Sequence, residues 1–230
     1  MSQPGYKQFC PVAMAAEILC TRWTIVLMRE LVAGTTRFNE LRRGVPKMSP
    51  TLLSQRLKEL ESAGVIDRKE IKSEKGLYEY RLTSAGKDVR PVVEAMGMWG
   101  QKWVESRLSL KNLDPSLLMW DMRRNLNPRP LPEERTVVQF MYLELAKSKQ
   151  LWWLVIEPDG VVDLCWSDPG FEVDLYVKTD LRTMTSIWMG LTTVKKEQDR
   201  MSLIGLKKVA DSMQVWLGLS PFAVQEKLVP

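Results

Sequence analysis

The 230-residue sequence contains no histidine. This absence excludes Ser-His-Asp and Cys-His catalysis and every metal site that needs an imidazole ligand. Cysteine is scarce as well: the three residues are Cys10, Cys20 and Cys165, with no C-x-x-C spacing. Neither a four-thiolate zinc site nor a disulfide framework within one chain fits this pattern. The sequence therefore predicts free thiols in a reducing compartment, and neither a metal nor a cofactor. It also predicts that the protein is not an enzyme, and the remaining alternative is acid-base catalysis by a pair of Asp and Glu side chains.

Long apolar runs are also missing. No stretch approaches the roughly 18 residues that a membrane span needs, and the N-terminal residues lack the apolar segment and cleavage site of a secretory signal. We therefore expect a cytoplasmic protein without membrane insertion. Hydrophobic residues make up 45% and charged residues 27% of the sequence, as in soluble globular proteins. A length of 230 residues favours two domains.

Positive charge is concentrated in the first half of the sequence. The net charge is +5, from 33 Lys and Arg against 28 Asp and Glu. Residues 1–107 contain 18 basic and 12 acidic side chains, whereas residues 108–230 contain 15 and 16. Residues 37–58 hold six basic side chains and one acidic residue, Glu40. Such a local excess is typical of a surface that contacts phosphates, and the alternative is a solvated face without a partner.

The first half has the pattern of a mostly α-helical winged helix-turn-helix. Residues 12–23 and 24–34 show helical periodicity and predict two helices with core-forming faces. The first of these faces consists of Val12, Ala15, Ala16 and Leu19. A short helix and a loop follow, then a longer helix, and the β-prone segments VIDRKEI and LYEYRLT flank a charged turn and predict a hairpin.

The longer helix, after Met48, is the most informative segment. Ser49 stands at its N-cap and Pro50 at its first helical position, and Ala63-Gly64 ends it. Its inner stripe consists of Leu53, Leu57 and Leu60. Because a helix fits the major groove, the opposite side is the side that would meet base edges. That side holds Thr51, Ser54, Gln55 and Lys58.

Further basic residues surround this helix. Lys72 and Lys75 at the hairpin tip would reach a minor groove, although Glu74 on the same tip weakens this prediction. Arg56 either pairs with an acidic neighbour or reaches the DNA backbone. The full set of candidate DNA-binding residues is Arg37, Arg42, Arg43, Lys47, Ser49, Pro50, Thr51, Ser54, Gln55, Arg56, Lys58, Lys72 and Lys75. The alternative is a winged helix that binds protein and not nucleic acid.

A helical pattern resumes at Ser84, with Pro91 as a break or kink. Its broad apolar stripe consists of Val92, Val93, Met96, Trp99, Trp103 and Leu108. Two interpretations remain open: a helix that pairs with a second copy of the chain, or a helix that packs against its own domain.

Four stretches carry a likeness to a known family: Cys10-Pro11-Val12, Arg22-Trp23-Thr24, RFNELRRGVPKMSPTLLSQRLKELESAGVIDR and YEYRLTSAGKDVRP. With them, residues 10–104 resemble the HxlR-type winged-helix transcriptional regulators. The resemblance implies binding to double-stranded DNA as a homodimer, a recognition helix after Met48, and terminal helices that form the dimer. Cys20-Thr21 departs from the small residues, often glycines, that the resemblance implies before Arg22-Trp23.

Some members of that family sense oxidants or electrophiles through a cysteine near the N-terminus, and Cys10 matches this position. Cys10 also precedes a helix N-terminus, which lowers the pKa of a thiol. The alternative is an inert cysteine, and Cys20 and Cys165 are interpreted as packing residues.

The second half predicts an α+β domain at residues 114–230, after a connector that begins at Leu108. Asp114-Pro115 would cap and start a helix. Period-2 alternation then predicts strands at residues 136–145, 150–158, 161–166 and 171–178, in hairpin order and hence in an antiparallel sheet. Residues 201–207 are a candidate fifth strand, and amphipathic helices lie around residues 181–191 and 209–216.

This second domain is similar to the sterol-carrier-protein type of lipid-binding fold, which implies an apolar tunnel between the sheet and the helices. The candidate pocket residues are Trp152, Trp166, Met184, Trp188, Met213 and Trp216. The alternative is that these side chains fill the core.

The combined prediction is a homodimeric transcriptional regulator. Residues 1–108 would bind DNA and dimerise, and an apolar small molecule or lipid bound by residues 114–230 would alter DNA affinity. Two alternatives remain: a lipid-binding or transfer protein that uses the winged helix for docking, and a redox-sensing regulator that acts through Cys10.

Overall fold

A computed structural model describes residues 5–106 and 110–229. The chain divides into two compact units, Met1–Gly97 and Met98–Pro230. Leu108, where we expected the first domain to end, lies outside the described residues.

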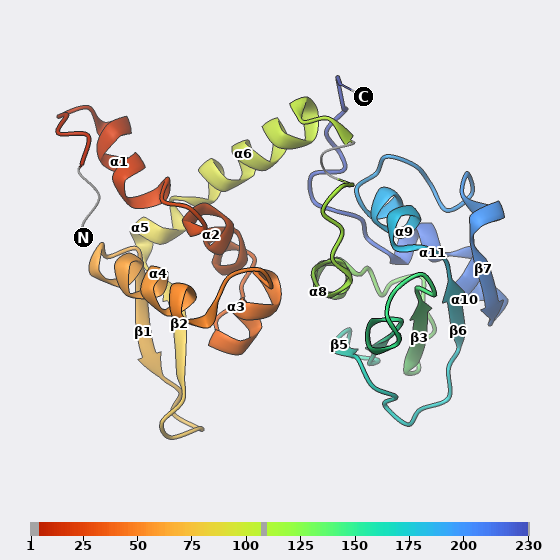
Figure 1. The fold of residues 1–230 in the computed structure, drawn as a ribbon. Coiled ribbons are helices and arrows are strands. Elements are labelled where there is room, and N and C mark those ends of the chain that lie inside the picture. The colour runs from red at the N-terminus through yellow and green to blue at the C-terminus, as the bar shows by residue number, and fades with distance from the viewer. Residues whose placement is uncertain (1–4, 107–109, 230) are drawn as a thin grey trace. The chain divides into compact units, whose positions relative to one another are not determined.

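The first unit is a winged helix-turn-helix (Figure 1). Its helices are α1 (Pro11–Leu19), α2 (Thr24–Val32), α3 (Phe38–Gly44), α4 (Pro50–Ser62), α5 (Ser84–Lys87) and α6 (Arg90–Trp103), which continues past Gly97. Its wing is an antiparallel hairpin of β1 (Ile66–Glu70) and β2 (Tyr78–Leu82). A bridge between Arg37 and Glu79 joins the segment before α3 to this hairpin. The predicted order of helices and hairpin is confirmed.

Helix α4 begins and ends as its sequence predicts. The Ser49 side chain accepts a hydrogen bond from the Leu52 N–H at 3.2 Å, and Pro50 stands in the first turn, where an N–H has no partner within the helix. Gly64 follows the helix with a φ of +70°, a left-handed conformation that suits glycine. The predicted inner stripe is buried: Leu53, Leu57 and Leu60.

The core of the first unit lies where α2, α3 and α4 meet the start of the wing. Its members include Leu27, Met28, Leu31, Leu41, Leu53, Leu57, Leu60 and Ile66. The fully buried Glu30 is paired with Arg29, whose Nη2 lies 2.6 Å from Glu30 Oε1. The same Nη2 donates to the Gly44 carbonyl at 2.8 Å. This network ties α2 to the end of α3.

Helix α1 is not the core element that its periodicity predicts. None of its nine residues, all of which the structure describes, is buried, and Val12 is 76% exposed. Leu19, at its C-terminal end, packs against the core. The apolar residues before it lie outside the core, because α1 extends away from α3 and α4 (Figure 1).

The helical pattern that starts at Ser84 forms two helices. Helix α5 ends at Lys87 and α6 begins at Arg90, so Pro91 stands in the first turn of a new helix and not at a kink. Val93 is buried in the core. The other described members of the predicted stripe are exposed: Val92, Met96, Trp99 and Trp103.

The second unit is α+β. Its helices are α8 (Pro115–Asn125), α9 (Leu181–Trp188), α10 (Lys207–Asp211) and α11 (Met213–Trp216), with 3-10 turns η1 (Lys147–Lys149) and η2 (Gln198–Arg200). Its strands are β3 (Thr136–Met141), β4 (Leu151–Ile156), β5 (Val162–Cys165), β6 (Leu175–Lys178) and β7 (Ser202–Gly205). They form one sheet in the order β5-β4-β3-β6-β7. Strand β7 confirms the candidate fifth strand, and Asp114 caps α8 by accepting from the Ser116 N–H at 3.0 Å.

The sheet is mixed, so the prediction of an antiparallel sheet in hairpin order was wrong in one connection. Strands β3 and β6 are parallel, whereas the other three pairings are antiparallel. The chain leaves β5 at one edge and returns on the far side of β3. Asp174 fixes this return: its Oδ2 accepts from the Val137 N–H at 2.7 Å. The last predicted strand forms only at Leu175–Lys178, and Phe171 before it is 41% exposed.

The main core of the second unit lies between one face of the sheet and helices α8 to α11. It includes Phe140, Trp152, Leu154, Leu175, Val177, Met184, Trp188, Met213 and Trp216. A smaller cluster on the other face contains Val137, Trp153 and Val155. Alternate residues of β3 and β4 thus enter opposite clusters, as strand geometry requires.

No single helix in the described ranges is long and apolar enough to span a membrane. Helices α1 and α2 pass that test of length and composition only as a pair bent by 83°.

Candidate nucleic-acid interface

The outer face of α4 is polar and open to solvent. The leucine stripe faces inward, so the residues on the opposite side line a shallow groove on the surface of the first unit. Four of its lining residues are the predicted base-reading set: Thr51, Ser54, Gln55 and Lys58. All four are exposed. The structure therefore brings these residues together on a single surface, with hydroxyl, amide and ammonium groups available to a partner.

Glu59 holds two of the predicted residues. The Gln55 Nε2 donates to Glu59 Oε1 at 2.9 Å, and Arg56 Nη1 is paired with Glu59 Oε2. Arg56 Nε also donates to the Arg22 carbonyl at 3.2 Å. Arg56 thus contacts its own unit, which corresponds to the pairing alternative of the sequence analysis.

Basic residues lie on both sides of the N-terminal end of α4. Arg42 and Lys47 are exposed, and Arg43 is half-buried. Ser49 and Pro50 stand exposed at the start of the helix. These positions allow long side chains to flank a groove-entering helix and contact phosphates, which position a protein on DNA without reading sequence.

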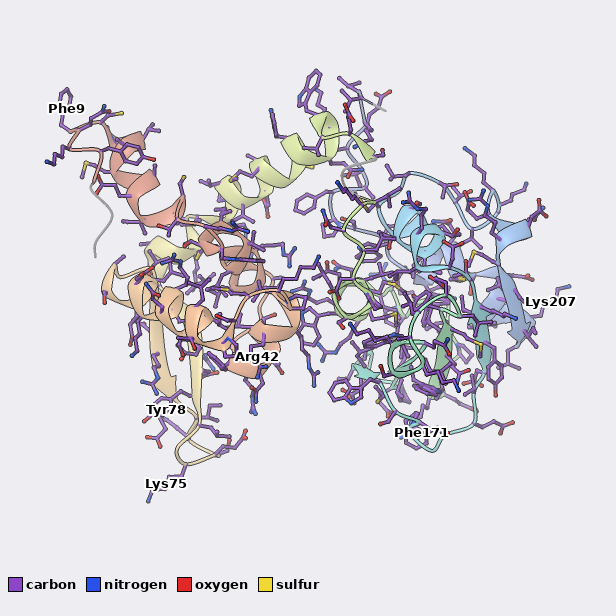
Figure 2. All side chains as sticks on the ribbon, viewed as in Figure 1. Phe9, Arg42, Lys75, Tyr78, Phe171 and Lys207 are labelled. Atoms are coloured by element: carbon purple, nitrogen blue, oxygen red, sulfur yellow. The ribbon has the colours of Figure 1, made fainter. Side chains whose placement is uncertain are left out.

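The tip of the wing carries two exposed lysines, Lys72 and Lys75; Figure 2 shows Lys75 pointing away from the tip. Arg37, which we predict as a phosphate contact, is paired with a carboxylate of the wing in this structure. Its Nη1 donates to Glu74 Oε2 at 3.2 Å, and its Nη2 is paired with Glu74 Oε1. This pairing with the carboxylate raises the pKa of the Arg37 guanidinium. Glu74 therefore occupies Arg37 in the free protein.

The contact of Arg68 with the Tyr78 ring was not predicted from the sequence. Its guanidinium carbon lies 3.8 Å from the centroid of the Tyr78 ring, on the adjacent strand of the wing. The hairpin register was the available signal, since an arginine and a tyrosine on neighbouring strands come into reach when the strands pair.

Cys10 is the N-cap residue of α1 and is half-buried. The backbone N–H groups of Ala13 and Val12 lower the pKa of its thiol, because they stabilise the thiolate. Cys20 is exposed and Cys165 is half-buried. Among residues 5–106 and 110–229, no three Cys, Asp or Glu side chains are grouped so that they could hold a metal ion.

Five of the six predicted ligand-pocket residues share the main core of the second unit: Trp152, Met184, Trp188, Met213 and Trp216. Two of these indoles donate to backbone carbonyls, Trp152 to Lys149 at 2.8 Å and Trp216 to Val209 at 2.7 Å. Trp166 does not join them, since it follows edge strand β5 and is 59% exposed.

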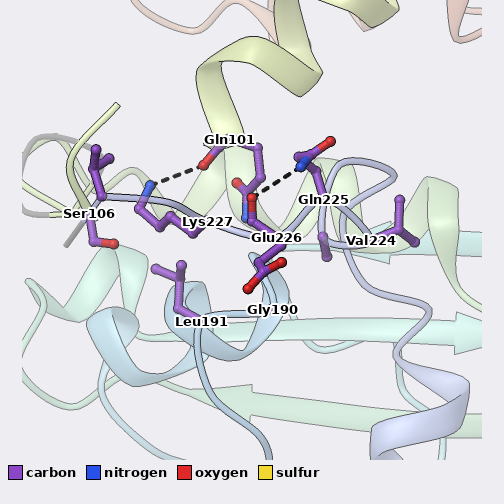
Figure 3. A pocket seen from close by; sticks show the side chains of 10 residues that line it. Gln101, Ser106, Gly190, Leu191, Val224, Gln225, Glu226 and Lys227 are labelled. Atoms are coloured by element: carbon purple, nitrogen blue, oxygen red, sulfur yellow. Dashed lines mark hydrogen bonds between the residues drawn. The ribbon is translucent and has the colours of Figure 1, made fainter. Parts of the chain in front are cut away.

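A separate polar pocket of about 480 Å³ lies in the second unit, between the end of α6 and the segment after α11 (Figure 3). Lys227 Nζ donates to the carbonyls of Gln101, at 3.2 Å, and Val104. The Gln101 amide in turn donates to the Met189 carbonyl at 3.1 Å. Residues 227 and 228 thus cap the C-terminal end of α6, because the Leu228 N–H also donates to the Lys102 carbonyl at 3.0 Å.

Comparison with known proteins supports the helix-turn-helix of the first unit. A model of the HxlR-like helix-turn-helix matches residues 18–108. The chain is 35% identical over 100 residues to the uncharacterized HTH-type transcriptional regulator YvaP of Bacillus subtilis (strain 168), a match that covers 43% of this chain and 93% of YvaP. YdeP of the same strain, also named an uncharacterized HTH-type transcriptional regulator, is 38% identical over 94 residues, or 41% of this chain and 73% of YdeP. The solved structure of the redox regulator HypR in its reduced form is 32% identical, covers 40% of this chain and 91% of that chain, and has a TM-score of 0.38.

The winged helix-turn-helix with its exposed polar helix face defines a DNA-binding transcriptional regulator and not an enzyme. Within that class, the chain belongs to the HxlR-like helix-turn-helix family. Residues 109–230 lie beyond the segment that the family model matches.

Proposed function

We propose that the protein is a homodimeric, sequence-specific regulator that inserts α4 into the major groove of DNA. The observation that carries this proposal is the division of α4 into a buried leucine stripe and an exposed face of Thr51, Ser54, Gln55 and Lys58. A helix held by its apolar side presents its polar side to base edges.

The residues of the exposed face have distinct roles in this proposal. Gln55 leaves Glu59 and forms a bidentate pair with adenine, while Thr51 and Ser54 bond to bases or phosphates. Lys58 contacts a phosphate, as do Arg42, Arg43 and Lys47 around the helix. Lys72 and Lys75 reach the adjacent minor groove from the wing.

The homodimer in this proposal forms through the two terminal helices of the family segment. Helix α1 exposes Val12, Met14 and Ile18, and α6 exposes Val92, Met96, Trp99 and Trp103. Apolar helix faces of this extent are typical of protein interfaces. Light scattering after size exclusion tests the dimer: the 26.5 kDa chain should elute at twice its mass, and Trp99→Glu with Met96→Glu should yield the monomer.

The experiment that tests DNA reading is fluorescence anisotropy of the full chain with DNA from upstream of its own gene and with scrambled DNA, at several salt concentrations. Tight, salt-sensitive binding with preference for the native DNA supports the proposal. Weak binding without preference would contradict the proposal and indicate that the winged helix is a docking module. Lipid binding or lipid transfer by the second unit would then be the favoured function.

In our proposal the second unit binds an apolar ligand, as the sterol-carrier-protein type of lipid-binding fold does. This ligand is an effector that changes the affinity of the first unit for DNA. The main core supports this, because helices α8 to α11 and the sheet enclose Met184 and Met213, whose flexible side chains can rearrange around a ligand. A titration with a fluorescent fatty acid tests it. Saturable binding that Met184→Trp abolishes supports the proposal, and binding unchanged by that substitution contradicts it.

A second candidate function is redox sensing through Cys10. It is favoured by the lowered pKa of the Cys10 thiol at the N-terminus of α1, since the thiolate is the form that oxidants attack. Peroxide or quinone should change DNA binding of the unaltered chain and leave Cys10→Ser unaffected. Equal DNA binding of both forms, with and without oxidant, eliminates this function.

A further inference from the structure

A pocket of about 420 Å³ opens between α3 and the wing of the first unit. Its volume lies within the range of about 300 to 1,000 Å³ that is common for small-molecule sites. One wall comes from Arg37 and α3, and the other from the wing strands and the turn between them. The pocket is separate from the exposed face of α4, with which it shares no lining residue.

The lining combines positive charge with aromatic rings. Three guanidinium groups border it, from Arg37, Arg43 and Arg68, and one carboxylate does so, from Glu40. The rings are Phe38, Tyr78 and Tyr80. Arginine and aromatic side chains together recognise planar anions, because the guanidinium forks pair with a carboxylate while the rings stack on a planar group.

A carboxylate of the wing turn, which is not itself a lining residue, already pairs with one of these guanidinium groups. Glu74 pairs with Arg37, and the two side chains are 37% and 46% exposed. An ion pair this open to solvent is weak. A ligand carboxylate that also brings ring contacts can therefore displace Glu74 from Arg37.

The wing wall of the pocket is preformed. The Ile71 N–H donates to the Leu77 carbonyl at 2.8 Å, and the Glu74 N–H donates to the Ile71 carbonyl at 3.0 Å. The Gly76 N–H donates to Glu70 Oε1 at 2.8 Å. The Leu77 N–H also donates to the Glu74 carbonyl at 3.0 Å. A turn fixed by these hydrogen bonds loses little conformational freedom when a ligand binds.

We propose that this pocket binds a small aromatic carboxylate, with its ring against Tyr78 and Phe38 and its carboxylate on Arg37 in place of Glu74. Duplex DNA is a poorer match for the pocket. A backbone phosphate brings no ring for the aromatic lining, and a base would have to leave the duplex stack to enter. The pocket is thus a small-molecule site beside the DNA-reading face.

Isothermal titration of the full chain without DNA tests the proposal, so the result does not depend on whether the protein binds an operator. The probe is 2-naphthoate, and the matched neutral compound is 2-naphthamide. We expect one saturable site for naphthoate and binding at least about tenfold weaker for naphthamide, because the amide lacks the charge that pairs with arginine.

Two substitutions with opposite expected effects locate the site. Arg37→Gln should weaken naphthoate binding at least about fivefold, and Glu74→Gln should tighten it at least about threefold by removing the competing carboxylate. Because misfolding cannot tighten binding, the Glu74 result separates the site from a general loss of structure.

Arg135→Gln is the control, since Arg135 also lies over a ring, that of Phe171 at 4.1 Å, but in the second unit. This variant should bind naphthoate like the unaltered chain. Absence of saturable binding, or binding that neither Arg37→Gln nor Glu74→Gln changes, would overturn the proposal.

Discussion

Glu30 and Gly44 meet at the junction of α2 and α3 with no space between them. A Cβ built on Gly44 would lie 1.9 Å from Glu30 Oε2, and Arg29 bridges the Glu30 carboxylate to the Gly44 carbonyl. The helix-turn-helix therefore depends on the absence of a side chain at residue 44.

We expect Gly44→Ala to lower the free energy of unfolding by about 2–4 kcal/mol, because the methyl group displaces a buried, paired carboxylate. Urea unfolding measures this change. Gly100→Ala is the matched control, since a Cβ there meets no atom within 4 Å, and it should be neutral or slightly stabilising. In a chain that already carries Glu30→Ala, Gly44→Ala should lower the free energy of unfolding by less. If the effects of the two substitutions on the free energy of unfolding were fully additive, the steric explanation would be contradicted.

Glu59 restrains the groove along the outer face of α4, because it holds both Gln55 and Arg56. Glu59→Ala should tighten DNA binding about threefold to tenfold, since it frees Gln55 and removes a negative charge that repels phosphates. Anisotropy at fixed salt measures the change. Glu61→Ala removes a carboxylate from the same helix outside the groove lining and should have a smaller effect, so equal effects of the two variants would contradict a specific role for Glu59.

We expect Gln55 to contribute to the sequence preference of DNA binding and Arg42 to contribute affinity that does not depend on sequence. Gln55→Ala should relax preference at one base pair by roughly 1–3 kcal/mol, whereas Arg42→Ala should weaken all sequences alike and flatten the salt dependence. Binding to a panel of single-base operator variants at two salt concentrations separates these outcomes. If both variants shifted all sequences equally, the orientation of α4 on DNA would be wrong.

We expect Tyr142 to make the second unit sensitive to alkaline pH. Burial raises the pKa of its hydroxyl far above the ordinary value, and the hydroxyl donates to Met119 Sδ at 3.4 Å. A raised folded-state pKa contributes stability that is complete below the unfolded pKa of about 10 and is lost as pH rises above it.

The free energy of unfolding should accordingly fall by about 1.4 kcal/mol per pH unit above pH 10 through this group. Tyr142→Phe should remove that component and cost at most about 1 kcal/mol at pH 7, because a thioether is a weak acceptor. Urea unfolding at pH 7, 10 and 11 measures both effects. Tyr176→Phe, at a residue that is 42% exposed, should leave the alkaline loss in place.

The sequence predicted most where the determinants are local. The Ser49 cap, Pro50 and the leucine spacing of α4 lie within one helix, so their pattern alone defines its ends and its buried face. The pairing of Arg37 with Glu74 joins residues 37 positions apart, and no periodicity indicates such a contact.

Two predictions failed for related reasons. The alternation in residues 136–178 indicates which segments form strands, but it does not indicate the order of those strands in the sheet. The parallel pairing of β3 with β6 could therefore not be predicted from it. The apolar face of α1 does not indicate whether that face packs against the core of its own chain. We predicted a core face for α1, and Val12 is exposed.

The cap that Lys227 places on the end of α6 has a consequence for synthesis. Lys227 follows Gln101 by 126 residues, which a ribosome adds in about 6 to 25 s at ordinary rates. During that interval the carbonyls of Gln101 and Val104 lack the partner that Lys227 later provides. The end of α6 that carries Trp99 and Trp103 is therefore completed only after nearly all of the second unit has been made.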